Sequence, residues 1–541
     1  MIAEPNKIST PRMALASLLP ALSFCILLYD NVFKLIPLGL NVPLYLAVFY
    51  LALSLALGKR FVSGLKSTLT HLALVILLCI PFVLISNPLL LTVSALLIIL
   101  LVGEQAMLCM KKTLYEPYSI AFIGDSLTFW FSFSFGGAKG AFTQYKNGGK
   151  SRFSGVLIGL AVTIPVLLAV IPLLMSGDAV FERIFRKAFG GLQWNDILGN
   201  TAAALLLFTL GSGLFWALAV KPRRKAAYIP PVAPYEQSPA SPPKQPACFN
   251  LTASFFLLGA LAAVLLPFCA IQFACLFSGN VPDGLTYAEY ARGGFWQLLA
   301  AAVIVITLVF LLLRFGAPCS PAANSARRVL MTLLLACTLV LLLSSFSRMA
   351  LYEQSFGFSQ LRLYTQFFMV ALFAFLLFSI ASLWRGRTGL KKCAFFCFLG
   401  CYIVMTFFNV DAFIARENVK NQGANTDVTY LTTLGPDALP YYIDMLDPAC
   451  FETEIISEDN YGRAAADTRE HRYLGDGRIL LYKDSSAAMQ AWYLSRIMRD
   501  VDVADGWRYF NTGRLAAKEA LAAHGALTAN IEKIQSAHCL D

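Results

Sequence analysis

Charge is scarce in this chain. Asp, Glu, Lys and Arg make up only 14% of its 541 residues, whereas soluble domains carry about a quarter. Histidine occurs four times, and the sequence contains no P-loop, no glycine-rich dinucleotide fingerprint and no His-Glu-x-x-His motif. This composition excludes an ordinary soluble domain, a disordered chain and a small disulfide scaffold, and it gives no support to ATP-driven or covalent chemistry.

Apolar residues are abundant instead, at 57% of the chain, with a mean hydropathy of +0.64. A helix that spans a bilayer needs about 20 mainly apolar residues. Eleven runs approach or reach this length, and we predict a membrane span in each. They cover residues 13–29, 35–57, 69–85, 88–109, 154–175, 197–220, 254–278, 295–313, 329–346, 367–384 and 393–410. The first run is predicted to be an uncleaved anchor, because no small-x-small cleavage site follows it.

The positions of the basic residues predict an orientation. If the amino terminus is cytoplasmic, the loops on the cytoplasmic side carry 23 Lys and Arg residues and the outer loops carry 7. This bias is typical of the positive-inside rule. Eleven spans then place the carboxyl terminus outside the cell. The net charge of +11 divides into +18 over the membrane region and −7 over residues 411–541, so it reports topology, and we predict no nucleic-acid partner.

Four domains are predicted along the chain. Residues 1–220 form a six-span region and residues 251–410 a five-span region, separated by a proline-rich cytoplasmic linker at residues 221–250. Residues 411–541 are polar enough to form an extracytoplasmic soluble domain. The predicted fold is therefore an all-α polytopic bundle of about eleven spans with a carboxyl-terminal, mainly helical domain.

Within the carboxyl-terminal domain, the sequence predicts helices at residues 428–434, 436–446, 485–500 and 511–524, the last capped by Asn511 and Thr512. A short extended stretch is predicted at residues 478–482, with room for one hairpin.

The densest polar cluster near a predicted membrane boundary contains Arg348, Tyr352, Glu353 and Arg362. Arg348 and Tyr352 share a helix face, and Glu353 is placed to pair with either arginine. A charge truly buried at this depth must be paired and marks a functional site. The alternative is an interfacial hairpin in which the arginines reach the lipid headgroups and tyrosines anchor the turn.

A second cluster contains Tyr287, Glu289 and Arg292, directly before the eighth predicted span. Glu289 and Arg292 are spaced for an i,i+3 pair. Because both clusters are predicted on the outer side, together they could line one cavity. An interfacial helix lying flat on the membrane is the equally supported alternative.

No metal site or cofactor is predicted. The four histidines are too far apart in the sequence for zinc, and His71 is interpreted as a structural residue. Cys393, Cys397 and Cys401 recur every four residues in the last span, where cysteine is interpreted as a small packing residue. Cys450 and Cys539 could form a disulfide outside the cell, but spacing does not decide their pairing.

Three stretches together resemble a known family: LTYAEYARGGF at residues 285–295, LYEQSFGFSQLRLY at 351–364 and NVDAFIARENV at 409–419. They are similar to bacterial polytopic membrane proteins classed only as a domain of unknown function, of the four-one-seven-three type. The resemblance covers about residues 250–520. It implies a bacterial multi-pass protein of the plasma membrane and cell envelope, and it carries no activity, cofactor or catalytic residue.

Two functions compete on the sequence alone. The favoured hypothesis is a non-enzymatic membrane protein, transporter-like or a sensory or assembly component of the envelope. Its partners would be the lipid bilayer and an envelope protein or small ligand at the external domain. The alternative is a membrane enzyme acting on lipid-linked or envelope substrates, with Glu289 and Glu353 as its carboxylates.

Overall fold

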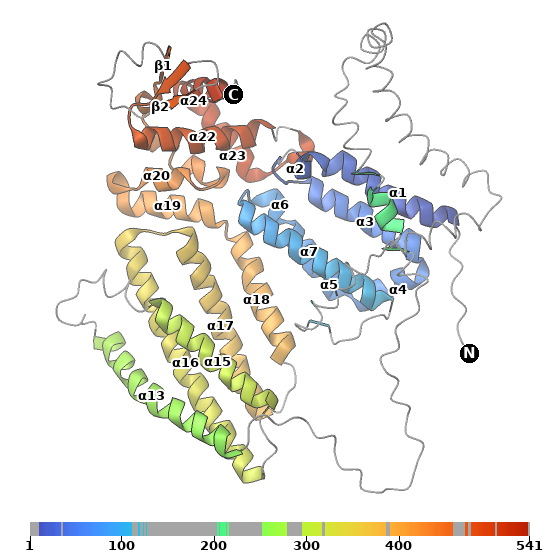
Figure 1. Cartoon of the computed structure of the whole chain (residues 1–541), viewed down its shortest axis with the longest axis vertical. Helices are drawn as coiled ribbons and strands as arrows, with labels where there is room; N and C mark the ends of the chain where they lie inside the picture. Colours follow the sequence, from blue (N-terminus) through green and yellow to red (C-terminus); the bar gives the residue numbers. More distant parts are fainter. Residues whose placement is uncertain are drawn as a thin grey trace. The chain divides into compact units, whose positions relative to one another are not determined.

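The structure, a computed structural model, is overwhelmingly helical (Figure 1). It describes residues 10–33, 36–110, 251–278, 295–315, 320–385, 390–457, 471–473, 478–503 and 506–538, with residues 117, 118, 123 and 126 and most of 203–215. The chain divides into two compact units. One combines Met1–Ala226 with Val428–Asp541, and the other is Ala227–Asp427.

The second unit is built around one long helix. Its elements are α13 (Leu251–Ser278), α15 (Phe295–Phe315), α16 (Pro321–Phe356), α17 (Gln360–Arg385), α18 (Leu390–Phe407), α19 (Val410–Gln422) and η1 (Gly423–Asn425). Helix α16 packs against α13, α15 and α17, and α17 packs against α18 and α19. Met331, Leu334 and Leu341 of α16 are buried in this core, which therefore consists of apolar side chains from neighbouring helices.

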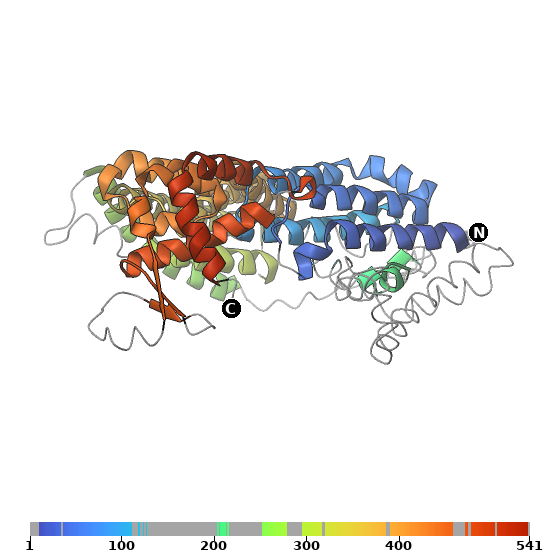
Figure 2. The ribbon, with the colours of Figure 1, turned by 90° about the horizontal axis from the view of Figure 1, so that it is seen from above.

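The amino-terminal part of the first unit is a group of shorter helices (Figure 2). These are α1 (Thr10–Leu27), α2 (Tyr29–Phe33), α3 (Asn41–Leu57), α4 (Lys59–Ser67), α5 (Leu69–Cys79), α6 (Pro81–Leu84) and α7 (Pro88–Cys109). Helix α1 packs along α3, and α7 packs along α4 and α5. Pro81 begins α6 directly after α5, where its missing N–H breaks the helical hydrogen-bond pattern.

The membrane prediction is confirmed in its coarse form. Among the described residues, α7, α16 and α17 are long and apolar enough to cross a membrane. Two sharply bent helix pairs, Phe61–Ser67 with Leu69–Leu84 and Lys392–Phe407 with Val410–Asn425, raise the number to five if each pair is one span. The predicted total of about eleven stays a prediction. The predicted span at 154–175, most of the one at 197–220 and the linker at 221–250 lie outside the described residues.

The carboxyl-terminal part of the first unit combines helices with a small sheet. Its helices are α20 (Val428–Thr432), α22 (Ser485–Val503), α23 (Thr512–Ala523) and α24 (Gly525–His538), with 3-10 turns η2 (Pro436–Tyr441), η3 (Ile443–Met445), η4 (Pro448–Phe451) and η5 (Trp507–Tyr509). Strands β1 (Glu454–Ser457), β3 (Arg478–Leu481) and β2 (His471–Tyr473) form an antiparallel sheet in that order, with Ile455 opposite Leu480 and Tyr473 opposite Ile479.

Two details of this part differ from the sequence prediction. The helix predicted at residues 436–446 is replaced by the 3-10 turns η2 and η3, because Pro440 lacks the N–H that an α-helix needs at that point. The single hairpin becomes three strands around the predicted extended stretch, which is β3. The structure groups Val428–Asp541 with residues 1–226 in one unit. This division does not test whether residues 411–541 form a domain of their own, and the boundary at residue 411 stays a prediction.

Hydrogen bonds tie the two parts of the first unit together along what we call the docking seam, formed by residues 30, 38–40 and 82–86 with residues 437 and 509–514. The Asp437 carboxylate accepts hydrogen bonds from the Ser86 N–H, at 2.6 Å, and from its hydroxyl. The Asn511 amide donates to the carbonyls of Phe82 and Ile85, at 3.1 and 2.6 Å. Asp437 and Asn511 are buried, so these bonds satisfy polar groups that water does not reach.

A buried arginine extends the docking seam. The Arg514 guanidinium donates to the carbonyls of Leu38 and Tyr509 and is only 4% exposed. Burial lowers its pKa to about 10, while Asp500 and Asp437 favour its charged form. The arginine therefore stays protonated at neutral pH, and its charge is balanced within the unit.

Gly513 tests the packing of the docking seam. A Cβ atom at this position would lie 1.7 Å from Asp437 Oδ1, so Gly513→Ala must displace the carboxylate that holds Ser86. We expect a loss of about 1–3 kcal/mol in the free energy of unfolding, measured by thermal unfolding of the full chain in detergent. The matched control is Gly525→Ala at the start of α24, where a Cβ meets open space. Equal effects of the two substitutions would contradict the role given to Asp437.

Candidate functional site

The candidate site lies at the end of α16, beyond its apolar stretch. At about 1.5 Å per residue, a helix of this length reaches about 54 Å, whereas the hydrocarbon core of a bilayer is about 30 Å thick. The apolar run of α16 lies between Arg327–Arg328 and Arg348. The last two turns, which carry Tyr352 and Glu353, therefore extend past the length that a membrane core requires.

Gly357 makes the turn from α16 into α17. Its φ is 76°, and a Cβ at this position would lie 2.6 Å from the Gln422 side chain and 2.9 Å from Asn418 Oδ1. Only glycine fits here without strain. Its N–H donates to the Glu353 carbonyl at 2.8 Å. The turn therefore brings α19 close to the end of α16.

Arg362 closes the same turn from α17. Its guanidinium donates to the Gly357 carbonyl, and its central carbon lies 4.1 Å above the centre of the Tyr352 ring. A guanidinium over an aromatic face is attracted by the negative π-surface of the ring. The structure thus pairs Arg362 with Tyr352 and with the backbone.

Glu353 has a different partner from the one expected. It is 5% exposed, and its Oε2 atom accepts a hydrogen bond from the Gln366 amide. Its Oε1 atom is buried and has no hydrogen-bond partner in the described part of the chain. Among the described residues no ion pair joins Glu353 to an arginine, because Arg362 is held on the Tyr352 ring. One oxygen of a buried carboxylate is thus left to accept a further hydrogen bond.

A polar pocket of about 370 Å³ opens beside Glu353. Its wall contains one carboxylate, four carboxamides, one phenyl ring and two small residues, namely Glu353, Gln354, Asn418, Asn421, Gln422, Phe358, Ala350 and Gly357. Such a wall offers several oxygen acceptors and amide donors at close range.

Asn418 fixes the shape of this pocket. Its Oδ1 accepts from the Phe358 N–H at 2.7 Å, and its Nδ2 donates to the Phe358 carbonyl at 2.9 Å. Near the start of both helices, Gln360 donates to Asp411 Oδ1 at 2.7 Å. These bonds join α19 to the α16–α17 turn and hold the pocket open between them.

The predicted site residues fall into two groups. Arg348, Tyr352, Glu353 and Arg362 lie on the last turns of α16 and the first turn of α17, and of these only Glu353 lines the pocket. Tyr287, Glu289 and Arg292 lie outside the described residues, so the predicted shared cavity and the distance between the two carboxylates stay predictions. Sequence reasoning missed Gln366 and the α19 carboxamides, which carry no spacing signal.

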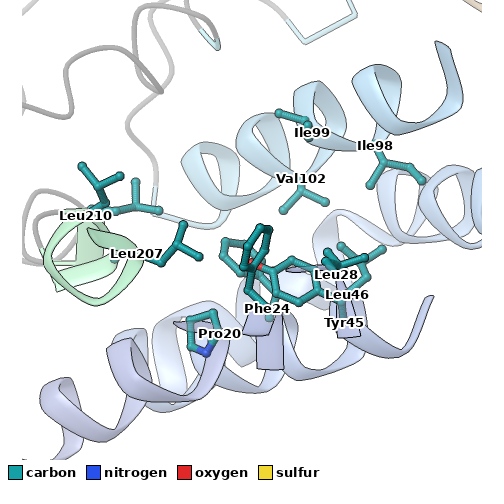
Figure 3. A pocket seen from close by; sticks show the side chains of 13 residues that line it. Pro20, Phe24, Leu28, Tyr45, Leu46, Ile98, Ile99, Val102, Leu207 and Leu210 are labelled. Carbon is teal, nitrogen blue, oxygen red and sulfur yellow. The ribbon is translucent and has the colours of Figure 1, made fainter. Parts of the chain in front are cut away.

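A second cavity, in the first unit, is almost purely apolar. It measures about 510 Å³ and is lined by side chains of α1, α3, α7 and residues 203–215 (Figure 3). Phe24 and Tyr45 point into it beside Val102 (Figure 3). A wall of this kind can fit an apolar ligand by its shape, but it has few groups that could form hydrogen bonds with a polar one.

The cysteines of α18 pack within the bundle. The Sγ atoms of Cys393 and Cys397 lie 3.7 Å apart, and the Cys401 thiol donates a hydrogen bond to the Phe367 carbonyl. Within the described part of the chain, no three His, Cys, Asp or Glu residues are grouped as a metal site requires. Cys450 is a free thiol near Asp447 and Lys483, and Cys539 lies outside the described residues.

Comparison with known proteins gives one match. The profile of a domain of unknown function, DUF4153, matches residues 17–445. The chain belongs to the DUF4153 family. The number in the expected designation was therefore wrong, while the class was right. The match differs from the expected residues 250–520 at both ends, because it begins at residue 17, in the amino-terminal helices, and stops at residue 445. No match was found among the curated proteins or the solved structures.

The role of Asn418 can be tested by truncation. Asn418→Ala removes both bonds to Phe358 and leaves its half-buried backbone groups without these partners, so we expect a loss of about 1–2 kcal/mol in unfolding free energy. Thermal unfolding of the full chain measures it. Asn421→Ala is the matched control, because Asn421 lines the same pocket but is exposed. If Asn421→Ala destabilises the protein as much, the bonds to Phe358 are not what holds α19 on the turn.

Proposed function

We propose that this DUF4153 protein is a non-enzymatic, multi-pass protein of the bacterial plasma membrane that binds a small organic cation in the Glu353 pocket. Its role is transporter-like or that of a sensory or assembly component of the envelope. The amino terminus is cytoplasmic and residues 411–541 lie outside. Family membership and the apolar helices support the membrane assignment.

The observation that carries the proposal is the Glu353 carboxylate. A buried ionised carboxylate costs several kcal/mol unless it is paired with a cation or fully hydrogen-bonded. Gln366 supplies one neutral donor, and Oε1 has none among the residues that the structure describes. An ammonium group in the adjoining pocket would donate to Oε1 and neutralise the charge at the same time.

The other lining groups fit the same ligand. The side-chain oxygens of Gln354, Asn421 and Gln422 can accept further ammonium protons, and the Phe358 ring offers an apolar face to the carbon atoms of the ligand. Glu353 is the one ionisable side chain among the described residues that line the pocket. General acid–base catalysis commonly divides its roles between two such groups, so the lining favours binding over reaction.

The docking seam supports the proposed orientation. Residues 30–34 and 86–87 are outer loops in the predicted topology. Asp437 forms a hydrogen bond with Ser86 in the second of these loops, and Asn511 forms one with Ile85, at the outer end of the predicted span 69–85. A carboxyl-terminal segment bonded to those loops lies on the same side of the membrane as they do.

Ligand binding is tested with amines of known charge. Methylammonium, butylammonium, putrescine and choline are added to the purified full chain, and the unfolding temperature is followed against concentration, with butanol as the neutral comparison. We expect a saturable rise for at least one amine and none for butanol. In Glu353→Gln the apparent affinity should fall at least about tenfold, which corresponds to about 1.4 kcal/mol.

Glu417→Gln is the matched control, because this half-buried carboxylate lies on α19 next to Arg416 and outside the pocket wall. An equal response of Glu353→Gln and the parent protein would contradict the proposed site, as would an absence of any amine effect.

The orientation has its own test. Reporter fusions after residue 235 and after residue 530 should indicate the cytoplasm and the exterior respectively, because an odd number of spans separates the termini. Any other pair of locations would overturn the eleven-span topology.

A further inference from the structure

A buried acid–base pair lies between two helices of the first unit. His71, in the first turn of α5, is 2% exposed, and Glu104, near the end of α7, is 1% exposed. The His71 Nε2 and Glu104 Oε2 atoms lie 3.3 Å apart, at ion-pair distance, but without the geometry of a hydrogen bond. Ionisable side chains inside an apolar bundle are costly and usually mark a function.

Tyr118 connects this pair to the surface. Its hydroxyl lies 2.8 Å from His71 Nδ1 and 2.6 Å from the hydroxyl of Thr70, which is exposed. Its ring stacks on the imidazole with centres 4.6 Å apart, and its N–H donates to Glu104 Oε1 at 3.1 Å. From Thr70 inward, the side chains pass from exposed to half-buried to buried.

The backbone of Tyr118 is strained in the way that functional residues often are. Its φ is 62°, in the left-handed region that residues other than glycine rarely occupy. The stacking on His71 and the bond to Glu104 offset this cost. Both contacts place the tyrosine hydroxyl against the imidazole.

A second set of bonds holds α7 in place next to the pair. Gln105 accepts from the Tyr50 hydroxyl of α3, and it donates to the Thr68 hydroxyl at 3.1 Å and to the Thr68 carbonyl. Gln105 and Thr68 are buried. The position of Glu104 beside His71 is therefore set by bonds to neighbouring elements.

We infer that Thr70, Tyr118 and His71 form a proton-transfer chain that loads one proton onto the His71 imidazole, with Glu104 as its fixed counter-charge. The ligand of this site is thus a proton, which enters and leaves at the exposed end of the chain, at Thr70. The inference is independent of the proposed cation pocket, because it uses other residues in the other unit.

Each step of the transfer balances. In the loaded state both ring nitrogens of His71 carry protons, Nδ1 donates to the Tyr118 oxygen and the Tyr118 hydroxyl donates to Thr70. On release, the Nδ1 proton passes to the Tyr118 oxygen, the former Tyr118 proton passes to the Thr70 oxygen, and the Thr70 proton passes to water. One proton leaves, no electrons move, and the two hydrogen bonds reverse direction.

Few other ionisable groups lie near the chain among the described residues. Tyr50 on α3 and Cys109 on α7 reach it only through Gln105 and Thr68, and Lys59 and Lys66 of α4 are exposed. Cys79 lies on α5 itself and is buried. Burial raises the pKa of the Tyr118 hydroxyl, with the Glu104 charge acting in the same direction, so this hydroxyl keeps a proton to pass on.

The chain is tested by the exchange of the His71 imidazole protons with water, followed by NMR on the full chain with nitrogen-15 histidine. His71→Gln identifies its signals among those of the four histidines. Tyr118→Phe keeps the stacked ring and the backbone bond but removes the hydroxyl, and we expect exchange at His71 to slow at least about tenfold. Tyr45→Phe, the same change in the apolar cavity, is the matched control and should leave exchange unaltered.

Unchanged exchange in Tyr118→Phe, or equal slowing in Tyr45→Phe, would overturn the inference. If Tyr118→Phe fails to fold, Thr70→Val decides, because Thr70 is exposed and its loss removes only the outermost carrier. Slower exchange at His71 in Thr70→Val supports the chain, and unchanged exchange there overturns it.

Discussion

The hydrogen bonds between the Asp437 carboxylate and Ser86 join segments 351 residues apart in the sequence. They make one unit of an amino-terminal group of apolar helices and a polar carboxyl-terminal segment. The carbonyls of Phe82 and Ile85 lie at the end of α6, where the helix stops before α7 and offers them no N–H donor of its own. The Asn511 side chain of the carboxyl-terminal segment donates to both. The closeness required at Gly513 shows why a small residue stands there.

The length of the apolar runs predicted several helices well. The run at residues 88–109 coincides with α7 at both ends, and the runs at 295–313 and 329–346 lie within α15 and α16. These predictions succeed because a spanning helix is specified by its own residues. The segment at residues 436–446 failed for an equally local reason, since Pro440 interrupts a pattern that otherwise favours a helix. The extended stretch at residues 478–482 was predicted and is β3, whereas β1 and β2 were not predicted, because both are very short and each forms only by pairing with β3.

The residues of the candidate site likewise include some that a single segment of sequence could predict and others that depend on packing between segments. Arg348, Tyr352, Glu353 and Arg362 could be predicted because charge at the edge of an apolar run is visible in one segment. Asn418 could not, because its role depends on the packing of α19 against a turn 60 residues earlier. Glu104 was not singled out, although it is an acidic residue inside the apolar run at residues 88–109, and His71 was noted but interpreted as structural. Their pairing needed Tyr118, which no helical spacing relates to either residue.

The two buried glutamates, Glu104 and Glu353, differ in the partners of their carboxylate oxygens, and the two carboxylates are therefore suited to different chemistry. Both oxygens of Glu104 face a positive or donating group, the His71 ring and the Tyr118 N–H, so the carboxylate already has its partners within the protein. Of the two Glu353 oxygens, one accepts a hydrogen bond from Gln366, and the other, beside a cavity, has no partner among the described residues. Because desolvation makes an unsatisfied charge expensive, the first arrangement favours a change of proton occupancy within the protein, and the second favours the arrival of a cation from outside it.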